Sequence, residues 1–89
     1  MKKVEINPDF KFEFETEKEL FSAQMSGYID VCDVVRVCYR YVGSKGSIDR
    51  PLKSREDYIN TIELYNNSED IEILEVYQDK WCYDRNDYL

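Results

Sequence analysis

The sequence predicts an α+β fold, a small two-layer sandwich in which two short helices pack on one face of a three- to four-stranded mixed or antiparallel sheet. Segments with alternating apolar and polar residues, typical of strands with one buried face, are separated by segments whose apolar residues recur at helical spacing. The 89 residues fit one domain, and 43% hydrophobic and 15% aromatic residues suffice for a core. We therefore expect a single domain over residues 1–89, with residues 84–89 as a tail.

The first strand is expected near the N-terminus. Phe10, Phe12 and Phe14 alternate with charged residues, which predicts a strand with three rings on one face. Residues 4–6 also alternate, but Pro8 follows closely. This stretch is therefore either a short edge strand or a lead-in.

A helix is predicted to begin at Glu17. Thr16 and Glu19 have the spacing of a capping box, in which the hydroxyl accepts from a main-chain N–H and the carboxylate reaches back. Gly27 is a plausible end, because glycine enters the left-handed region freely. The apolar stripe expected to face the core consists of Leu20, Phe21, Met25 and Tyr28.

A second strand is predicted from Val35 to Tyr41, where apolar residues alternate with Arg36, Cys38 and Arg40. The glycine- and serine-rich residues 43–47 then predict a flexible loop. Because the connection over residues 43–53 is long for a domain of this size, we expect it to be a candidate contact site.

The second helix is expected to start after Ser54, a favourable capping residue, and to end within residues 66–68. Its buried stripe should contain Tyr58, Ile59, Ile62 and Tyr65.

Residues 71–77 predict the last strand. Its alternation shifts between Ile73 and Leu74, which indicates either a β-bulge or burial of both faces. Residues 78–80 either turn the chain into a hairpin with residues 81–83, or the strand runs on to Tyr83.

Composition excludes several classes of function. No apolar run approaches the roughly 20 residues of a membrane helix, so we expect a cytoplasmic protein that does not enter a membrane. The absence of histidine removes the commonest general base and the commonest metal ligand. The net charge of −7 argues against direct binding to nucleic acid. We expect no enzyme, no catalytic residue, no metal and no cofactor.

Three weaker candidates have simpler interpretations. Glu13 and Glu15 could act as an acid and base pair, but cross-strand ion pairs with Arg36 and Arg40 are the expected role. The second candidate is a metal site formed by Asp30, Cys32 and Asp33, for which a loop or a helix terminus is the alternative. The third is a nucleophile at Cys38, which lacks a neighbouring activating pattern.

Acidic residues and tyrosines gather near the C-terminal end. Tyrosine is common at interfaces because it combines a rigid ring with a polar tip, and acids complement a groove rich in lysine and arginine. The alternative is a solubilising surface whose tyrosines belong to the core. The candidate partner-binding residues are Glu63, Tyr65, Glu69, Asp70, Glu72, Glu75, Tyr77, Asp79 and Tyr83.

The chain resembles the small acidic inhibitors of phages and mobile elements, of which the anti-CRISPR proteins are the best-known group. The resemblance lies in its size, its charge of −7, runs such as Tyr58-Ile59-Asn60 and the acidic stretch 68–72. It implies an inhibitor that occupies a basic nucleic-acid-binding groove of a host defence effector, of which a CRISPR effector is one example, in the host cytoplasm. Members of this class share no common fold, so the resemblance implies no role for a particular residue.

The expected partner is therefore a protein with a basic surface. A self-associating structural or regulatory protein, including a homodimer, is the alternative. The basic segment 36–55, with six bases and one acid, could form a secondary contact with nucleic acid or an acidic partner.

Overall fold

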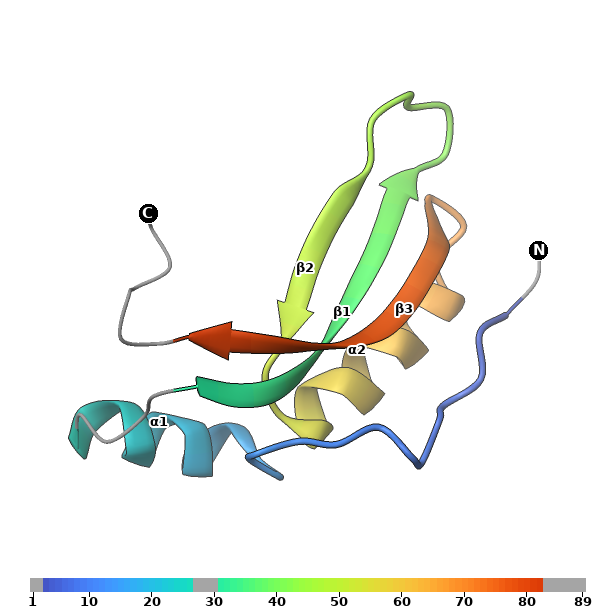
Figure 1. The fold of residues 1–89 in the computed structure, drawn as a ribbon. Helices are drawn as coiled ribbons and strands as arrows, with labels where there is room; N and C mark the ends of the chain where they lie inside the picture. The colour runs from blue at the N-terminus through green and yellow to red at the C-terminus, as the bar shows by residue number, and fades with distance from the viewer. Residues whose placement is uncertain (1–2, 27–30, 83–89) are drawn as a thin grey trace.

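The computed structural model of the chain describes residues 3–26 and 31–82. Two helices and a three-stranded antiparallel sheet form a small α+β fold, which confirms the predicted fold class. Figure 1 shows the sheet with α2 against one face and α1 at the end where β2 stops. In chain order, the elements are α1 (Glu17–Ser26), β1 (Val31–Tyr41), β2 (Ile48–Leu52), α2 (Arg55–Asn66) and β3 (Ile71–Cys82).

The strand order is β2-β1-β3, so β1 is central and the other two strands are edges. β2 pairs with β1 from Val35 to Tyr39, whereas β3 pairs along the whole of β1. Cys38 lies opposite Glu75 and Tyr39 lies opposite Ile73, which leaves Leu74 as the extra residue of a β-bulge. The predicted shift of parity is therefore a bulge.

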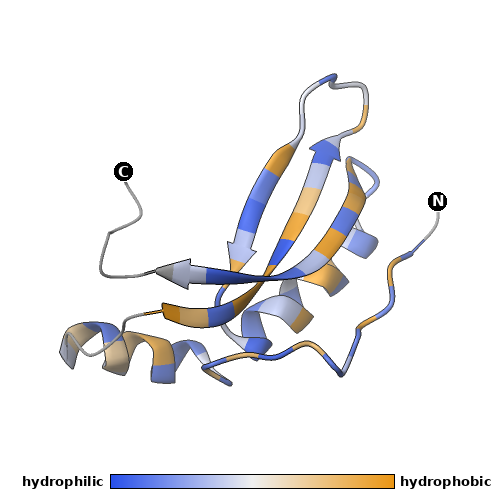
Figure 2. Cartoon of the chain, viewed as in Figure 1, coloured by the Kyte–Doolittle hydropathy of each residue, from blue (hydrophilic) through white to orange (hydrophobic). Residues whose placement is uncertain are grey.

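The core lies between α2 and the inner face of the sheet. Ser54 caps α2 as predicted, since its Oγ accepts from the Asp57 N–H at 3.1 Å. Figure 2 shows the alternation of polar and apolar residues along the strands that face this core. The buried cluster contains Val35, Val37, Tyr39, Leu52, Tyr58, Ile62 and Tyr65, with Ile59 packed against it.

The strand predicted over Phe10–Phe14 is wrong. None of its residues belongs to the three-stranded sheet, and this segment lies instead along α2 as an extended lead-in. Phe10 and Phe12 each place a ring centroid 5.5 Å from that of Tyr58, and the Tyr58 hydroxyl accepts from the Asn7 N–H at 2.8 Å. The alternation therefore reflects contact with a helix, and Phe14 forms only an isolated bridge to Ser54.

α1 begins at Glu17 as predicted, and Thr16 Oγ1 accepts from the Glu19 N–H at 3.2 Å. The stripe expected to face the core is mostly exposed, because only Leu20 is buried in this helix, while Phe21 and Met25 are 62% and 87% exposed. The predicted end at Gly27 and the stripe residue Tyr28 lie outside the described residues.

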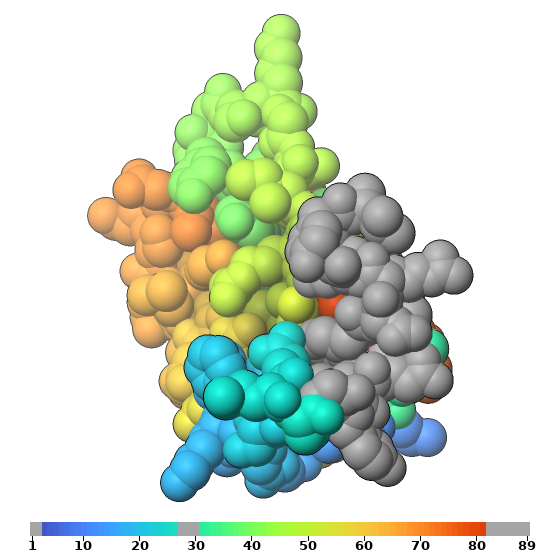
Figure 3. Space-filling view, turned by 90° about the vertical axis from the view of Figure 1, so that its left-hand side faces the viewer, coloured from blue at the N-terminus to red at the C-terminus, as the bar shows by residue number. Residues whose placement is uncertain are grey.

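β2 was not expected from the sequence. Pro51 lies within it, and a proline is tolerated there because β2 is an edge strand whose outer side needs no N–H donor. The loop before β2 begins at a turn in which Gly43 has φ of +90°, a conformation that favours glycine. Figure 3 shows this loop projecting beyond the body of the protein.

β3 continues to Cys82 without the turn considered at residues 78–80. Its C-terminal half pairs with the start of β1, a stretch that sequence patterning had left unassigned.

Candidate protein-binding surface

One side of the sheet carries no described helix opposite Arg36 to Arg40 of β1, and we call this the outer face. Paired residues on neighbouring antiparallel strands share a face, so the register identifies its members. They are Arg36, Cys38 and Arg40 of β1, Asp49 and Pro51 of β2, and Glu72, Glu75, Tyr77 and Asp79 of β3.

Arg36 joins the three strands of this face. Its Nε lies 2.6 Å from Asp79 Oδ2, and its Nη1 lies 3.4 Å from Asp49 Oδ1. The Tyr77 hydroxyl donates to Asp49 Oδ2 at 2.8 Å. The network therefore fixes Tyr77 and Asp79, two of the candidate residues, in defined positions.

Titration of these groups follows from their hydrogen bonds. The main-chain N–H of Lys80, followed by the Arg36 guanidinium, holds the pKa of Asp79 below its ordinary value against an opposing effect of burial. The hydrogen bond to Asp49 raises the pKa of Tyr77. Asp79 is therefore a paired anion at neutral pH, and Tyr77 remains a neutral donor.

Glu72 is paired as well, because Arg40 Nε lies 2.9 Å from its Oε1. The positive charge of Arg40 offsets the carboxylate, so Glu72 adds little to the acidity of the surface.

Trp81 lies at the other end of β3 beside two cations. The guanidinium carbon of Arg36 lies 5.2 Å from the centroid of its ring, and Lys53 Nζ lies 4.5 Å away. Both distances are within the range of cation–π contacts. No pattern in the sequence singles out Trp81 or Asp49, because Pro51 obscures the strand in which Asp49 lies.

The unpaired acids lie at the start of β3. Glu69 and Asp70 are exposed in the turn after α2, Glu75 is exposed beyond the bulge, and none of them has an ion-pair partner among the residues that the structure describes. Leu74 is 44% exposed between them, and Tyr77 follows at partial exposure. We call residues 69–77 the acidic edge.

The other candidate residues are dispersed. Glu63 is exposed on α2 near its C-terminal end. Tyr65 is only 8% exposed, with its ring centroid 4.7 Å from that of Tyr39, so its expected role at a surface contact is wrong. It belongs to the core because its helical spacing from Tyr58 and Ile62 places it on the buried face of α2. Tyr83 lies outside the described residues.

Tyr65 also takes part in a polar cluster at the core boundary. Arg50 Nη1 lies 3.2 Å from Thr61 Oγ1 and 3.4 Å from the Tyr65 hydroxyl. The hydrogen bond with Tyr65, together with burial, raises the pKa of Tyr39 to about 12. These contacts satisfy the buried polar atoms of α2 and assign the cluster a structural role.

The expected ion pairs of Glu13 and Glu15 with Arg36 and Arg40 are wrong. Glu15 Oε1 lies 2.9 Å from Arg55 Nε, because the N-terminal segment lies beside α2 and away from the outer face. Glu13 is exposed.

The residues considered for a metal site or a nucleophile are separated. Asp33 forms an ion pair with Lys80, Cys32 is buried and Asp30 lies outside the described residues. Cys38 is a partly exposed free thiol on the outer face. Within residues 3–26 and 31–82, no three histidine, cysteine or acidic side chains gather closely enough to hold a metal ion.

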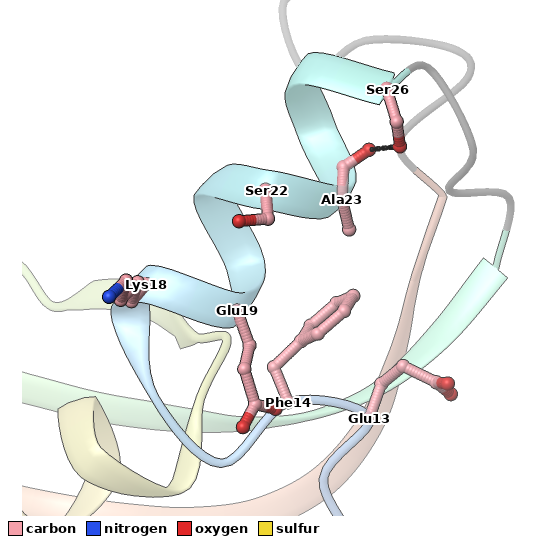
Figure 4. Close-up of a pocket in the computed structure, with 7 residues that line it drawn as sticks. All are labelled: Glu13, Phe14, Lys18, Glu19, Ser22, Ala23 and Ser26. Atoms are coloured by element: carbon pink, nitrogen blue, oxygen red, sulfur yellow. Dashed lines mark hydrogen bonds between the residues drawn. The ribbon is translucent and has the colours of Figure 1, made fainter.

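A hollow of about 570 Å³ lies beside α1. In Figure 4 the Phe14 ring points toward Ala23, and the Ser26 hydroxyl is occupied by a hydrogen bond to the Ala23 carbonyl oxygen. Glu19 Oε2 accepts from the Glu15 N–H at 3.3 Å. These polar groups serve the ends of the helix.

Among the described residues, no helix has both the length and the apolar character that crossing a membrane requires. No protein family, no curated protein and no solved structure matches this chain.

Proposed function

We propose that this chain is a non-enzymatic acidic binding protein that docks its acidic edge on a basic surface of a partner protein. The observation that carries the proposal is the position of Glu69, Asp70 and Glu75, all without an ion-pair partner among the described residues, beside exposed Leu74 and partly exposed Tyr77. Unpaired acids provide long-range attraction to a basic partner, and neighbouring apolar and aromatic groups provide contact area.

The kind of partner follows from charge and from the resemblance to acidic phage inhibitors. A net charge of −7 disfavours direct contact with a nucleic-acid backbone and favours a groove that normally holds one. We therefore propose a stoichiometric inhibitor that occupies such a groove in a host defence effector, of which a CRISPR effector is one example.

Self-association is the second candidate. It is favoured by the length of β3, a 12-residue strand that lies at the edge of the sheet. Sedimentation or size-exclusion chromatography over a range of concentrations separates the two candidates. A monomer at all concentrations contradicts self-association, whereas a stable dimer favours it.

The acidic edge is tested by removing its charge without changing side-chain size. The variant carries Glu69→Gln, Asp70→Asn and Glu75→Gln. A matched control removes the same three charges from the N-terminal segment through Glu5→Gln, Asp9→Asn and Glu13→Gln, all at exposed positions. Both variants are expected to fold as the parent does, because exposed substitutions of this kind usually change stability by no more than about 0.5 kcal/mol.

Each protein is immobilised and used to capture partners from a bacterial lysate at low and at moderate salt. We expect the parent and the control to capture a basic nucleic-acid-handling protein that salt releases, and the acidic-edge variant to lose roughly tenfold or more in affinity for it. Equal loss in both variants would mean that net charge, and not this edge, determines binding. Unchanged capture by the acidic-edge variant would refute the assignment of this surface.

A further inference from the structure

We infer that the free edge of β3 accepts an extended basic segment of the partner as a fourth strand of the sheet. This inference rests on the proposed function and specifies how the partner is held. In such a complex, main-chain hydrogen bonds supply affinity and alternate side chains supply specificity.

The topology leaves two edges, and they differ. β2 is a strand of five residues that contains Pro51, which has no N–H to offer an added strand. β3 has 12 residues without proline, and within residues 3–26 and 31–82 it pairs with β1 alone. An incoming strand therefore finds main-chain donors and acceptors along β3 and an interrupted edge at β2.

No described segment occupies this edge. The N-terminal segment comes closest to β3 at Gln78, where Gln78 Oε1 accepts from the Lys11 N–H at 2.6 Å and Nε2 donates to the Lys11 carbonyl oxygen at 2.9 Å. These contacts use the Gln78 side chain. Among the described residues, no main-chain hydrogen bond joins β3 to a segment other than β1.

Side chains of β3 at and next to the bulge are available to an added strand. On the outer face, Glu75 is exposed and Tyr77 is partly exposed. Leu74 has no partner on β1 because of the bulge, and it is 44% exposed. An added strand would thus meet one unpaired carboxylate, one aromatic ring and one aliphatic side chain within four residues.

Charge decides between a foreign strand and a second copy of this chain. The residues of β3 that pair with β1 on the outer face are three acids and two aromatic residues, namely Glu72, Glu75, Asp79, Tyr77 and Trp81. Glu72 and Asp79 are paired with Arg40 and Arg36, whereas Glu75 has no ion-pair partner among the described residues. Edge-to-edge pairing of two copies would bring two such unpaired carboxylates to one junction between chains that each carry a net charge of −7. A strand that carries lysine or arginine at alternate positions replaces this repulsion with attraction.

The experiment uses the full chain, labelled with nitrogen-15, and a short synthetic peptide in which lysine alternates with valine. Two further peptides carry N-methyl groups at either the lysines or the valines. Because an added strand bonds to the sheet only through alternate N–H groups, methylation of one set should abolish binding and methylation of the other should not. Amide chemical shifts of residues 71–82 report the site, and titration gives the affinity.

We expect the unmodified peptide to shift the β3 amides and one methylated peptide to bind nearly as well. The other should bind roughly tenfold or more weakly, because several hydrogen bonds of about 1 kcal/mol each are lost. Glu75→Gln in the protein should also weaken binding of the unmodified peptide, whereas Glu13→Gln should not.

Other results overturn the inference in distinguishable ways. Equal binding of both methylated peptides would show attraction by charge without strand addition, and the proposed function would stand. The same holds if no peptide binds while charge-dependent capture of a partner protein persists. A chain that dimerises through β3 would overturn the choice of occupant, and loss of charge-dependent capture would remove the proposed function itself.

Discussion

Arg36 is the residue on which the outer face depends most. Arg36 contacts Asp79 on one neighbouring strand and Asp49 on the other. Burial lowers the pKa of the Arg36 guanidinium, but the hydrogen bonds to these two carboxylates outweigh that effect, so the pKa is raised. These paired charges join adjacent strands where no described helix covers the sheet. The acids that Arg36 and Arg40 do not reach are the ones that we propose for partner binding.

Asp79 gives a prediction about pH. Its pKa is lowered in the folded protein, so the charged form stabilises the fold above the unfolded value near 3.8, and this contribution is lost as the pH falls through the lower folded value. We expect Asp79→Asn to be less stable than the parent at neutral pH and to approach it in acid, as the pH falls below 3.8 and through the lowered folded pKa. Urea unfolding at neutral pH and in acid measures this.

The matched change Asp70→Asn removes a carboxylate that has no ion-pair partner among the described residues. It controls for loss of net charge. A difference between parent and Asp79→Asn that is the same at both pH values would contradict the assigned role of Asp79.

Ser54 gives a second prediction. It is fully buried, and its hydroxyl caps α2 through the Asp57 N–H. We expect Ser54→Ala to lower the free energy of unfolding by about 1–2 kcal/mol, the usual cost of losing such a cap. Ser22→Ala on the exposed surface of α1 serves as the control, with an expected change within about 0.5 kcal/mol. Denaturant unfolding that gives equal values for the two variants would refute the capping role.

Single residues also set the limit of prediction from the sequence. Tyr65 and Tyr77 occur in the same acidic region, yet one is buried against Tyr39 and the other faces outward. Helical spacing could have assigned Tyr65 to the core. The position of Tyr77 depends on the bulge, which was one of two interpretations of the shift of parity at Leu74, the other being burial of both faces.

At the scale of elements, patterns that depend on neighbouring residues predicted well. The start of α1, both ends of α2 and the Val35–Tyr41 part of the central strand follow from capping and alternation. Two segments could not be predicted in this way because tertiary context decides them. Residues 10–14 have the pattern of a strand but pack on Tyr58 of α2, and β2 carries a proline that only an edge strand tolerates.

The bulge in β3 leads to a prediction about deletions. Removing Leu74 leaves Ile71, Ile73 and Val76 facing the core and Glu72, Glu75 and Tyr77 facing outward. We therefore expect the deletion variant to fold, at a cost of about 1 kcal/mol or less for a half-exposed position. Circular dichroism and thermal unfolding measure this.

Deletion of Val76 is the matched comparison. It removes a residue packed on the core and, once the bulge is absorbed, places the charged Glu75 opposite Val37 on the buried face of the sheet. Cooperative unfolding should be lost. If the two deletions behave alike, the register assigned to β3 is wrong.

At the scale of the whole molecule, charge is the dominant property. The net charge of −7 on 89 residues leaves self-repulsion after the surface ion pairs have formed, and such pairs each contribute little. We expect the melting temperature to rise by a few degrees, on the order of 1 kcal/mol in stability, when sodium chloride is raised from low to moderate concentration. Differential scanning calorimetry provides the measurement.

The triple change Glu69→Gln, Asp70→Asn and Glu75→Gln should raise the melting temperature at low salt and reduce its dependence on salt. A melting temperature that falls with added salt in the parent would mean that the ion pairs outweigh the repulsion. In that case the triple change would have no excess repulsion between charges to relieve.

The chain contains one tryptophan, Trp81, and eight tyrosines. Arg36 and Lys53 lie against the ring of Trp81. The protein thus carries a built-in optical probe at one end of β3. Light absorbed by the tyrosines passes to this single indole, so fluorescence emission at long wavelength reports one site. An occupant that displaces either cation, or that stacks on β3 nearby, should change this emission without any added label.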